Sequence, residues 1–331
     1  MMDSMFISCL IAFIVSLAAV WFLMPYLIDY LKGLSFNQNV SEYSLDEYKE
    51  KAKTPIMGGV LFIIVPLIVS FISELFLGFS LETLVLQLAF LGYGAIGFID
   101  DWLIVVRHNN DGLKPSYKLI MQIVLAFIIY LIYRSSVGNL SIRIPFTNVS
   151  VALGHFYVVV ILLMFAGSSN AVNLTDGMDG LAAGCSVCAF SVFLILAIME
   201  KKVVMAVFLS SLIGSLFGYL HYNVKPAKIF MGDTGSLALG GALAACAMIL
   251  KQELALIVIG GVFVLDTLSC IIQIGSVRLR GKRVFPYTPI HYSFVLPKEK
   301  NGLGLGEVQT VHIIWAAAAV FAALGLFIAL H

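Results

Sequence analysis

Long apolar runs separated by short polar segments make up almost the whole chain. Ten of these runs approach the roughly 20 residues that an α-helix needs to cross a lipid bilayer. The predicted helices cover residues 5–29, 56–76, 83–104, 117–134, 151–167, 181–199, 202–219, 235–251, 254–275 and 309–330. The first run is too long for the core of a signal peptide, so we expect it to be retained as a helix. The pattern predicts an all-α polytopic membrane protein whose 331 residues form a single integral-membrane domain.

Composition agrees with this class. The chain is 60% hydrophobic and only 12% charged, which leaves too few polar residues to cover a water-soluble protein of this length. Its formal net charge of +1 argues against a general nucleic-acid binder. We therefore expect a membrane protein with no nucleic-acid partner.

Basic residues orient the predicted helices. The loops after the odd-numbered helices contain fifteen of them: Lys32, Lys49, Lys51, Lys53, Arg107, Lys114, Lys118, Lys225, Lys228, Arg278, Arg280, Lys282, Arg283, Lys298 and Lys300. The other side contains five: Arg134, Arg143, Lys201, Lys202 and Lys251. Because cytoplasmic loops are enriched in lysine and arginine, the odd-numbered loops are predicted to be cytosolic and both termini to lie outside.

Carboxylates gather at the predicted cytosolic helix ends, although a carboxylate close to hydrocarbon is costly. Asp100 and Asp101 follow the apolar run LGYGAIGFI at the end of the third helix. Solvation of a helix end explains one such acid. Adjacent carboxylates also raise one another's pKa, which suits a general base or a divalent-cation ligand. For this pair alone both interpretations are open.

The segment NAVNLTDGMDG, residues 170–180, repeats a polar side chain every three residues. The repeated residues are Asn170, Asn173, Asp176 and Asp179. Gly177 and Gly180 indicate a turn or a loosened helix start, where backbone N–H groups can face a ligand. Helix capping explains one of these side chains and not four, so we expect a binding or catalytic role.

The segment FMGDTGS, residues 230–236, places Asp233 between glycines just before the eighth helix. An acid there serves equally well as a helix N-cap or as an oxygen ligand of Mg²⁺, which takes one or two carboxylates together with substrate phosphate oxygens. Phe230 and Asn223 offer an aromatic face and an amide that suit a base and a sugar.

One acid lies inside the ninth apolar run. Asp266 and Gln273 are seven residues apart and share a helical face, which we expect to look into the bundle or a wet cavity because an acid facing lipid is costly. The following loop is basic before it reaches His291, and it can anchor the topology or attract anionic lipid or substrate phosphate.

Five strings, in order, resemble the signature of the phospho-N-acetylmuramoyl-pentapeptide transferases, in the polyprenyl-phosphate N-acetylhexosamine-1-phosphate transferase superfamily. They are KTPIMGG, GFIDDWL with a following GLxxxxK, SNAVNLTDGMDGLA, FMGDTGSLALGG and GKRVFPYTPIH, and they run from Lys53 to His291. The resemblance implies a multi-pass enzyme of the bacterial inner (plasma) membrane whose active site faces the cytoplasm. Such an enzyme transfers phospho-N-acetylmuramoyl-pentapeptide from UDP-MurNAc-pentapeptide to undecaprenyl phosphate. The products are lipid I, for peptidoglycan biosynthesis, and UMP.

The resemblance also implies cofactors, partners and residue roles. It implies a requirement for Mg²⁺, contact with membrane lipids, a homodimer, and inhibition by nucleoside antibiotics. The implied catalytic residues are Asp100, Asp101, Asp233 and His291, with Asp233 as the metal ligand and one of the paired aspartates as the base that deprotonates the lipid phosphate. The implied substrate-binding residues are Lys53, Lys118, Asn173, Asp176, Gly177, Met178, Asp179, Asn223, Phe230, Asp266 and Gln273, with Phe230 stacking on uracil.

The chain departs from this family after Ile290. The family usually has three consecutive histidines there, whereas this chain has His291-Tyr292-Ser293, so only the first histidine carries over. This departure keeps open a sister enzyme that transfers N-acetylglucosamine-1-phosphate to the same lipid. A secondary transporter for an anionic solute is the alternative from another class. It would place its acids near the bilayer midplane, whereas these acids cluster at one interface, apart from Asp266.

Overall fold

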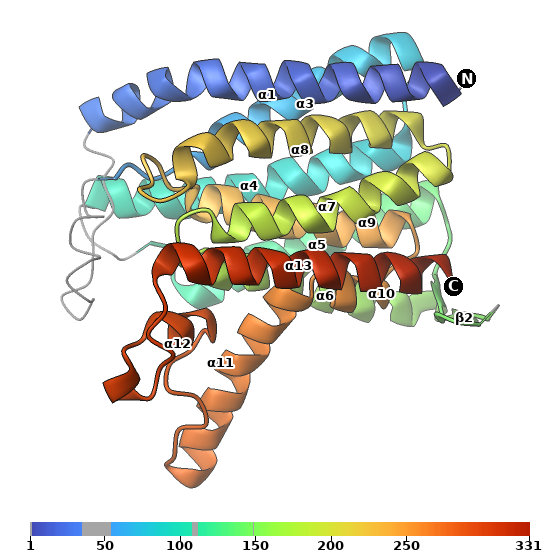
Figure 1. Ribbon diagram of the computed structural model, residues 1–331. Helices are drawn as coiled ribbons and strands as arrows, with labels where there is room; N and C mark the ends of the chain where they lie inside the picture. Colours follow the sequence, from blue (N-terminus) through green and yellow to red (C-terminus); the bar gives the residue numbers. More distant parts are fainter. Residues whose placement is uncertain (1, 35–53, 108–111, 148) are drawn as a thin grey trace.

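Long helices run side by side in the computed structural model, which describes residues 2–34, 54–107, 112–147 and 149–331 (Figure 1). Within these residues, ten helices are long and apolar enough to cross a membrane, which confirms the predicted all-α polytopic class. The ten helices are α1 (Met2–Gly33), α3 (Gly59–Leu77), α4 (Leu81–Arg107), α5 (Pro115–Ser136), α6 (Tyr157–Thr175), α7 (Leu181–Met199), α8 (Val203–Asn223), α9 (Gly232–Ile249), α11 (Gly261–Arg280) and α13 (Glu307–Leu330).

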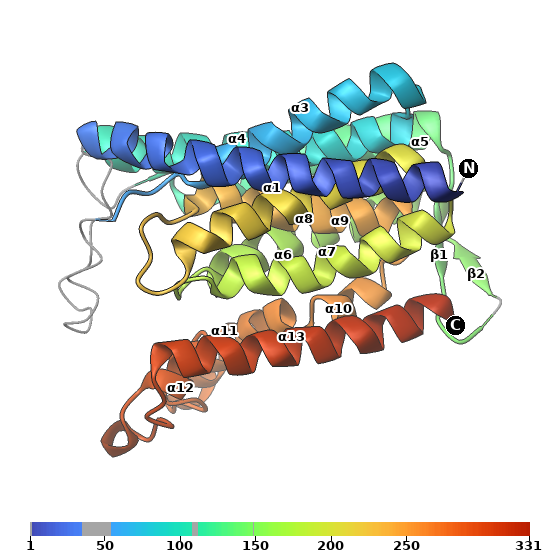
Figure 2. The same cartoon turned by 45° about the horizontal axis from the view of Figure 1, so that its top comes forward.

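The shorter elements lie between these helices. They are β1 (Ser141–Arg143), β2 (Ser150–Ala152), the 3-10 turn η2 (Gly154–Phe156), α10 (Ala255–Ile259), α12 (His291–Val295) and the 3-10 turn η3 (Lys298–Lys300). Both ends of the chain lie at one end of the bundle, beside the β1–β2 hairpin (Figure 2). At the other end, α4, α6 and α8 finish and α5, α7 and α9 begin. This alternation agrees with the predicted order of loops.

Helix α9 forms the centre of the bundle together with α8. In each, 89% of the most apolar window is buried inside the protein. Small residues allow the neighbouring helices α4 and α6 to approach α9 closely. A Cβ at Gly97 of α4 would overlap the backbone of Asp233, and a Cβ at Gly240 of α9 would overlap the backbone of Ser168 in α6. Close approach of backbones through small residues is typical of membrane helices. It brings the ends of α4 and α6 onto the start of α9.

The helix predicted over residues 254–275 is divided in two. Helix α10 ends before Gly260, and α11 begins at Gly261 and leans away from the bundle, with α12 beside it (Figure 1). The apolar run is continuous across this region, which is why the hydropathy pattern predicted one span. The backbone leaves the helical conformation at Gly260, and Gly261 allows close packing against α13, because a Cβ there would lie 2.5 Å from the Phe321 ring.

The helix predicted over residues 151–167 begins later and extends further. Residues 150–152 form β2, which pairs with β1 as an antiparallel hairpin, and α6 covers Tyr157–Thr175. Polar side chains near the end of α6 find partners inside the bundle. Asn170 Nδ2 donates to Gln122 Oε1 at 2.7 Å and to the Ala166 carbonyl at 2.8 Å. The helix therefore continues through the polar segment that hydropathy had placed outside it.

Candidate active site

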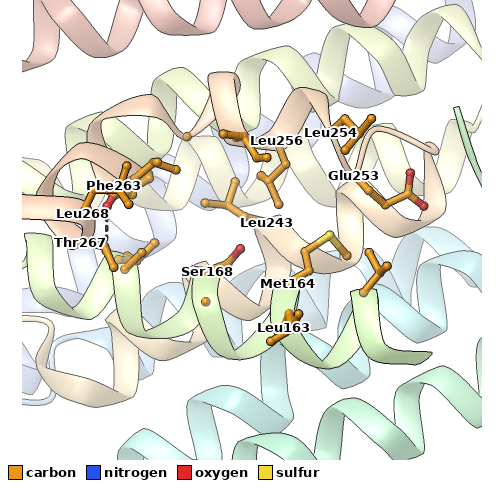
Figure 3. A pocket seen from close by; sticks show the side chains of 17 residues that line it. Leu163, Met164, Ser168, Leu243, Glu253, Leu254, Leu256, Phe263, Thr267 and Leu268 are labelled. Atoms are coloured by element: carbon orange, nitrogen blue, oxygen red, sulfur yellow. Dashed lines mark hydrogen bonds between the residues drawn. The ribbon is translucent and has the colours of Figure 1, made fainter. Parts of the chain in front are cut away.

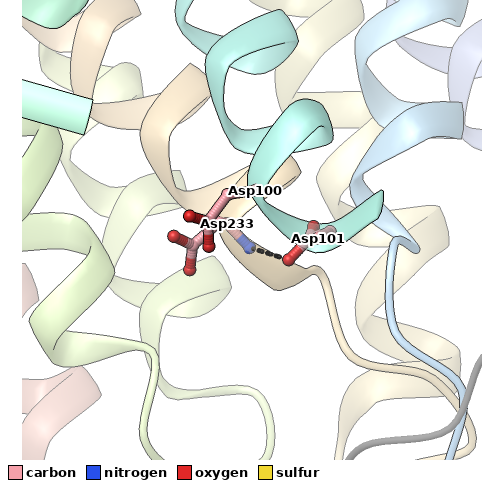
Figure 4. Close-up of side chains that lie close together, drawn as sticks. All are labelled: Asp100, Asp101 and Asp233. Carbon is pink, nitrogen blue, oxygen red and sulfur yellow. Dashed lines mark hydrogen bonds between the residues drawn. The ribbon is translucent and has the colours of Figure 1, made fainter. Parts of the chain in front are cut away.

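Three carboxylates meet where the last turns of α4 lie beside the start of α9 (Figure 4). Asp100, Asp101 and Asp233 each offer an oxygen, and these oxygens lie within 4.8 Å of one another. Asp100 and Asp101 are only 4% and 3% exposed. The close contact at Gly97, less than one turn before the pair, is what allows two residues of α4 to reach a residue that follows 132 positions later. The family resemblance implied that these three acids act at one site, and in the structure they lie together.

The Asp101 carboxylate caps the start of α9. Its oxygens accept hydrogen bonds from the backbone N–H of Asp233 at 3.1 Å, from the backbone N–H of Thr234 at 2.9 Å, and from Thr234 Oγ1 at 2.6 Å. A negative charge at a helix N-terminus is stabilised by the free N–H groups and by the helix dipole. Asp101 therefore holds the backbone that carries Asp233.

Asp100 and Asp233 face a lysine and an amide instead. Lys118 Nζ lies 3.3 Å from Asp100 Oδ2 and forms a close ion pair with Asp233. The backbone N–H of Leu113 donates to Asp100 Oδ1 at 2.8 Å, and Asn173 Nδ2 donates to Asp233 Oδ1 at 2.6 Å. One cation is thus shared between two acids, and both acids are oriented by other hydrogen bonds.

This group, Asp100, Asp101, Asp233, Lys118 and Asn173, is called the carboxylate site below. The group contains three acids and one lysine, so with every acid ionised it would carry two surplus negative charges. Mg²⁺ prefers oxygen ligands and is usually held by one or two carboxylates. The donor atoms of Asp100 and Asp233, between which an ammonium group already lies, fit such a cation.

The turn between α6 and α7 carries four predicted substrate-binding residues: Asp176, Gly177, Met178 and Asp179. Met178 is buried. Asp179 Oδ2 accepts a hydrogen bond from the Ala227 N–H at 3.0 Å, so the turn is tied to the segment before α9. Asn223 makes a second tie, since its Oδ1 accepts from the Gly180 N–H at 3.0 Å and its Nδ2 donates to the Ile229 carbonyl at 2.9 Å. In the structure the Asn223 amide braces two loops.

His291 and Asp266 form a buried pair. His291 Nδ1 lies 2.8 Å from Asp266 Oδ2, and the His291 side chain is shielded from solvent. Its other ring nitrogen, Nε2, has no hydrogen-bond partner among the described residues. A Cβ at Gly177 would lie 2.6 Å from this Nε2, so the histidine edge faces the turn between α6 and α7. An acid that fixes one ring nitrogen leaves the other available to a ligand.

Two further predicted residues shape the surroundings. Gln273 Oε1 accepts hydrogen bonds from the N–H groups of Val284 and Phe285 at 2.9 and 3.0 Å, so it holds the basic loop after α11. Phe230 is half-buried, and its backbone pairs with the strand-like segment at Pro55, whose carbonyl accepts from the Phe230 N–H at 2.9 Å. Lys53 lies outside the described residues.

The sequence patterns did not predict several residues that lie at the site. Ser236 Oγ lies 2.9 Å from Asn173 Nδ2, and Tyr292 and Glu307 contact the turn between α6 and α7. Ser236 stood within the FMGDTGS string, so a signal was present. Glu307 follows Asp179 by 128 residues and nothing in its local pattern indicates the contact.

An apolar cavity of about 400 Å³ lies between α6 and the α10–α11 segment (Figure 3). Its walls include Leu163, Met164, Leu243, Phe263 and Leu268. Ser168, Ala171 and Val172 extend its lining along α6 toward Asn173 of the carboxylate site. A cavity with this lining suits a hydrocarbon chain.

Comparison with known proteins gives concordant similarities. Residues 83–251 match glycosyl transferase family 4. The chain is 42% identical over 319 residues to the phospho-N-acetylmuramoyl-pentapeptide-transferase of Bacillus thuringiensis (strain Al Hakam), covering 96% of this chain and 95% of that protein. It is 42% identical, with the same coverage, to that of Bacillus cereus (strain AH187). It is 40% identical to that of Geobacillus sp. (strain WCH70), over 96% of this chain and 97% of that protein.

Proposed function

The chain belongs to the phospho-N-acetylmuramoyl-pentapeptide transferases, within glycosyl transferase family 4, and from this premise we propose how its carboxylate site makes lipid I. The reaction is a phosphoglycosyl transfer in peptidoglycan biosynthesis. An oxygen of undecaprenyl phosphate forms a bond to the phosphorus that carries the N-acetylmuramoyl-pentapeptide. The bond from that phosphorus to the oxygen shared with UMP breaks, and UMP leaves.

The gathering of three carboxylates around one lysine is the observation that carries this proposal. Both substrates are anionic, so three acids would repel them unless a cation intervenes. Asp233 and Asp100 would hold Mg²⁺, which when bound supplies the positive charge that draws the two phosphates together. The ammonium group of Lys118, now between these acids, would then be available to a substrate phosphate.

The residues around Asp233 keep it in place. Asp101 fixes the backbone of Asp233 and Thr234, and Asn173 holds the Asp233 side chain from the α6 side. Positioning of this kind is the main contribution that a protein makes to phosphoryl transfer. We assign Asp101 mainly to this role, since three hydrogen bonds from α9 already occupy its oxygens.

A general base is not required by the chemistry. The second pKa of a phosphate monoester is about 6, so the lipid phosphate is largely dianionic at neutral pH. Its attacking oxygen already carries no proton. We therefore assign neither Asp100 nor Asp101 to an obligatory proton transfer.

The donor would lie across the turn between α6 and α7. Phe230 offers a half-buried ring for the uracil, and Asp176 and Asp179 border the same region. His291 Nε2 faces Gly177 and would meet a phosphate or the sugar. The Asp266 carboxylate holds the opposite ring nitrogen and orients this edge.

The acceptor would place its polyprenyl chain in the apolar cavity beside α6. Leu163, Met164 and Phe263 provide a hydrocarbon surface, and Ser168 and Val172 continue it toward Asn173. A lipid lying there would present its phosphate at the helix ends where Asp233 lies.

The protein is a multi-pass protein of the inner membrane. We propose that the carboxylate site faces the cytoplasm, because the basic residues are concentrated in the loops at that end of the bundle. A homodimer and inhibition by nucleoside antibiotics are further proposals that rest on family membership.

Turnover by the purified chain in detergent tests the proposal. We expect UMP release from UDP-MurNAc-pentapeptide only when undecaprenyl phosphate and Mg²⁺ are both present. Release from UDP-N-acetylglucosamine instead would assign the chain to the sister activity left open by Tyr292 and Ser293. Solute uptake into liposomes without UMP release would show that the chain acts as a transporter and would contradict the proposed enzyme activity.

A further inference from the structure

Three side chains from the C-terminal quarter of the chain hold the turn between α6 and α7. Tyr292 Oη donates to the Gly177 carbonyl at 3.0 Å, and Trp315 Nε1 donates to the Gly180 carbonyl at 3.2 Å. Between them, the Asp179 N–H donates to Glu307 Oε1 at 3.2 Å. Three backbone polar groups of the turn thus have partners in α12 and α13, which follow it by more than a hundred residues.

Glu307 connects this turn to a second loop. Its Oε2 lies 2.5 Å from Lys225 Nζ, in the segment between α8 and α9. The same segment is joined to the turn by the hydrogen bond from the Ala227 N–H to Asp179 Oδ2. The Glu307 side chain is only 6% exposed, so its charge is shielded from water and depends on these partners.

The attachment of α13 to the bundle does not depend on Glu307. Further along α13, the side chains of four residues are buried against the other helices: Thr310, Val311, Ile314 and Ala318. The apolar side chains keep α13 in place whether or not its first residue carries a charge. Glu307 is therefore placed to influence the turn more than the fold.

We propose that Glu307 is a positioning residue for nucleotide binding. It holds the Asp176–Asp179 turn against the segment that leads to Phe230. These two segments form the walls of the proposed nucleotide site, and Glu307 keeps the distance between them fixed. Burial raises the pKa of Tyr292 above its ordinary range, so the Tyr292 hydroxyl stays protonated and keeps donating to the Gly177 carbonyl. This inference rests on the proposed function, because it assigns the nucleotide to that turn.

Binding of UMP to the full-length chain in detergent tests the inference. Hydrogen bonds to charged groups correspond to roughly tenfold to 100-fold in an equilibrium constant. We expect Glu307→Ala to weaken UMP binding by about that factor, because both the Asp179 N–H and Lys225 lose their partner. Glu307→Gln keeps an acceptor for the N–H and loses the ion pair, so we expect a loss of only about threefold.

Matched variants separate this role from a structural one. Lys225→Met removes the ion pair alone and should resemble Glu307→Gln. Glu299→Gln removes an exposed acid from the same C-terminal region and should bind UMP like the unaltered chain. In turnover assays, Glu307→Ala should raise the KM for the nucleotide substrate and leave kcat within about threefold of its original value. The melting temperature without ligand should fall only slightly, because the Lys225 side chain is 35% exposed and regains water when its partner is removed.

The inference is overturned if Glu307→Ala folds and binds UMP as tightly as the unaltered chain. If that variant does not fold, Glu307→Gln and Lys225→Met decide, and full UMP affinity in both overturns it. Failure of the unaltered chain to bind UMP would contradict the proposed function itself, which is a separate result.

Discussion

At the end of the bundle that holds the termini, two lysines each form a close ion pair with one acid, whereas the carboxylate site at the other end gathers three acids around one lysine. Lys251 Nζ lies 2.6 Å from Glu253 Oε1, and the Tyr157 ring and hydroxyl pack beside them. Lys202 Nζ lies 2.6 Å from Glu82 Oε2. Lys202 is also 3.8 Å from Glu200, which is largely exposed.

The difference separates charges that serve the fold from charges that await a ligand. A buried acid with its own lysine is neutralised within the protein. Asp100 and Asp233 share Lys118, whereas the partners of Asp101 among the described residues are N–H and O–H groups. Buried negative charge of this kind persists in a membrane protein when it binds or reacts with something. Chelation, substitution and binding experiments can each test this contrast.

Metal removal should have the largest effect, and only at the carboxylate site. Excess EDTA should reduce UMP release to background, because nothing then offsets the surplus charge between two anionic substrates. Added Mg²⁺ should restore release. Full turnover in the chelator would mean that Lys118 alone supplies the positive charge. The carboxylate site would then need no metal ion and would not differ from the paired end in this respect.

Substitution of Asp233 should come next. Asp233→Asn removes one carboxylate charge and should lower UMP release by at least about 1000-fold, since metal stabilisation of the transition state amounts to several kcal/mol. The protein should still insert and elute normally. Glu82→Gln, a change of the same kind at the paired end, is the control and should keep nearly full turnover. Near-normal release from Asp233→Asn would exclude it as a metal ligand.

Breaking a pair at the opposite end should affect stability instead of catalysis. Lys251→Met leaves Glu253, which is 2% exposed, without its cation. The loss of one partner of a buried pair costs about 3–5 kcal/mol in the free energy of unfolding. Thermal melting in detergent measures this loss, and the KM for the nucleotide substrate should not change. Lys300→Met, at an exposed site, should melt like the original chain. A stable Lys251→Met variant with impaired substrate binding would reverse the assignment of the two ends.

The smallest effect should come from Phe230, which lies near the carboxylate site and carries no charge. Phe230→Ala should weaken UMP binding by about 1–3 kcal/mol, the scale of base–aromatic stacking. Phe230→Tyr retains the ring and should preserve most of the affinity. Calorimetric titration distinguishes the two variants, and equal affinity in Phe230→Ala and the unaltered chain would remove the stacking role.

Sequence patterns predicted the number of long helices and the convergence of Asp100, Asp101 and Asp233. They placed α6 several residues too early, because hydropathy cannot tell that Asn170 finds a partner in Gln122. They also missed the break at Gly260, because apolar residues continue on both sides of it.

Predictions for single side chains fared differently. Asn223 and Gln273 were expected to meet substrate, and in the structure their amides brace loops. Their roles toward a ligand stay predictions. Glu307 gave no signal, because an acid at the start of a helix is common and its contact with Asp179 joins distant parts of the chain.

Hydropathy and charge are local properties of a sequence, and each can be read without knowing which helices pack together. The sequence by itself therefore determined the membrane class, the alternation of helices and the end of the bundle where the acids gather. Which acid does what depended on side chains that meet only after helices pack. The contact of Gly97 with the start of α9 turned Asp101 toward the helix N-terminus and left Asp100 facing Lys118. Two adjacent aspartates therefore acquired different surroundings. No local pattern carries that information, because the partners are supplied by helices far apart in the sequence.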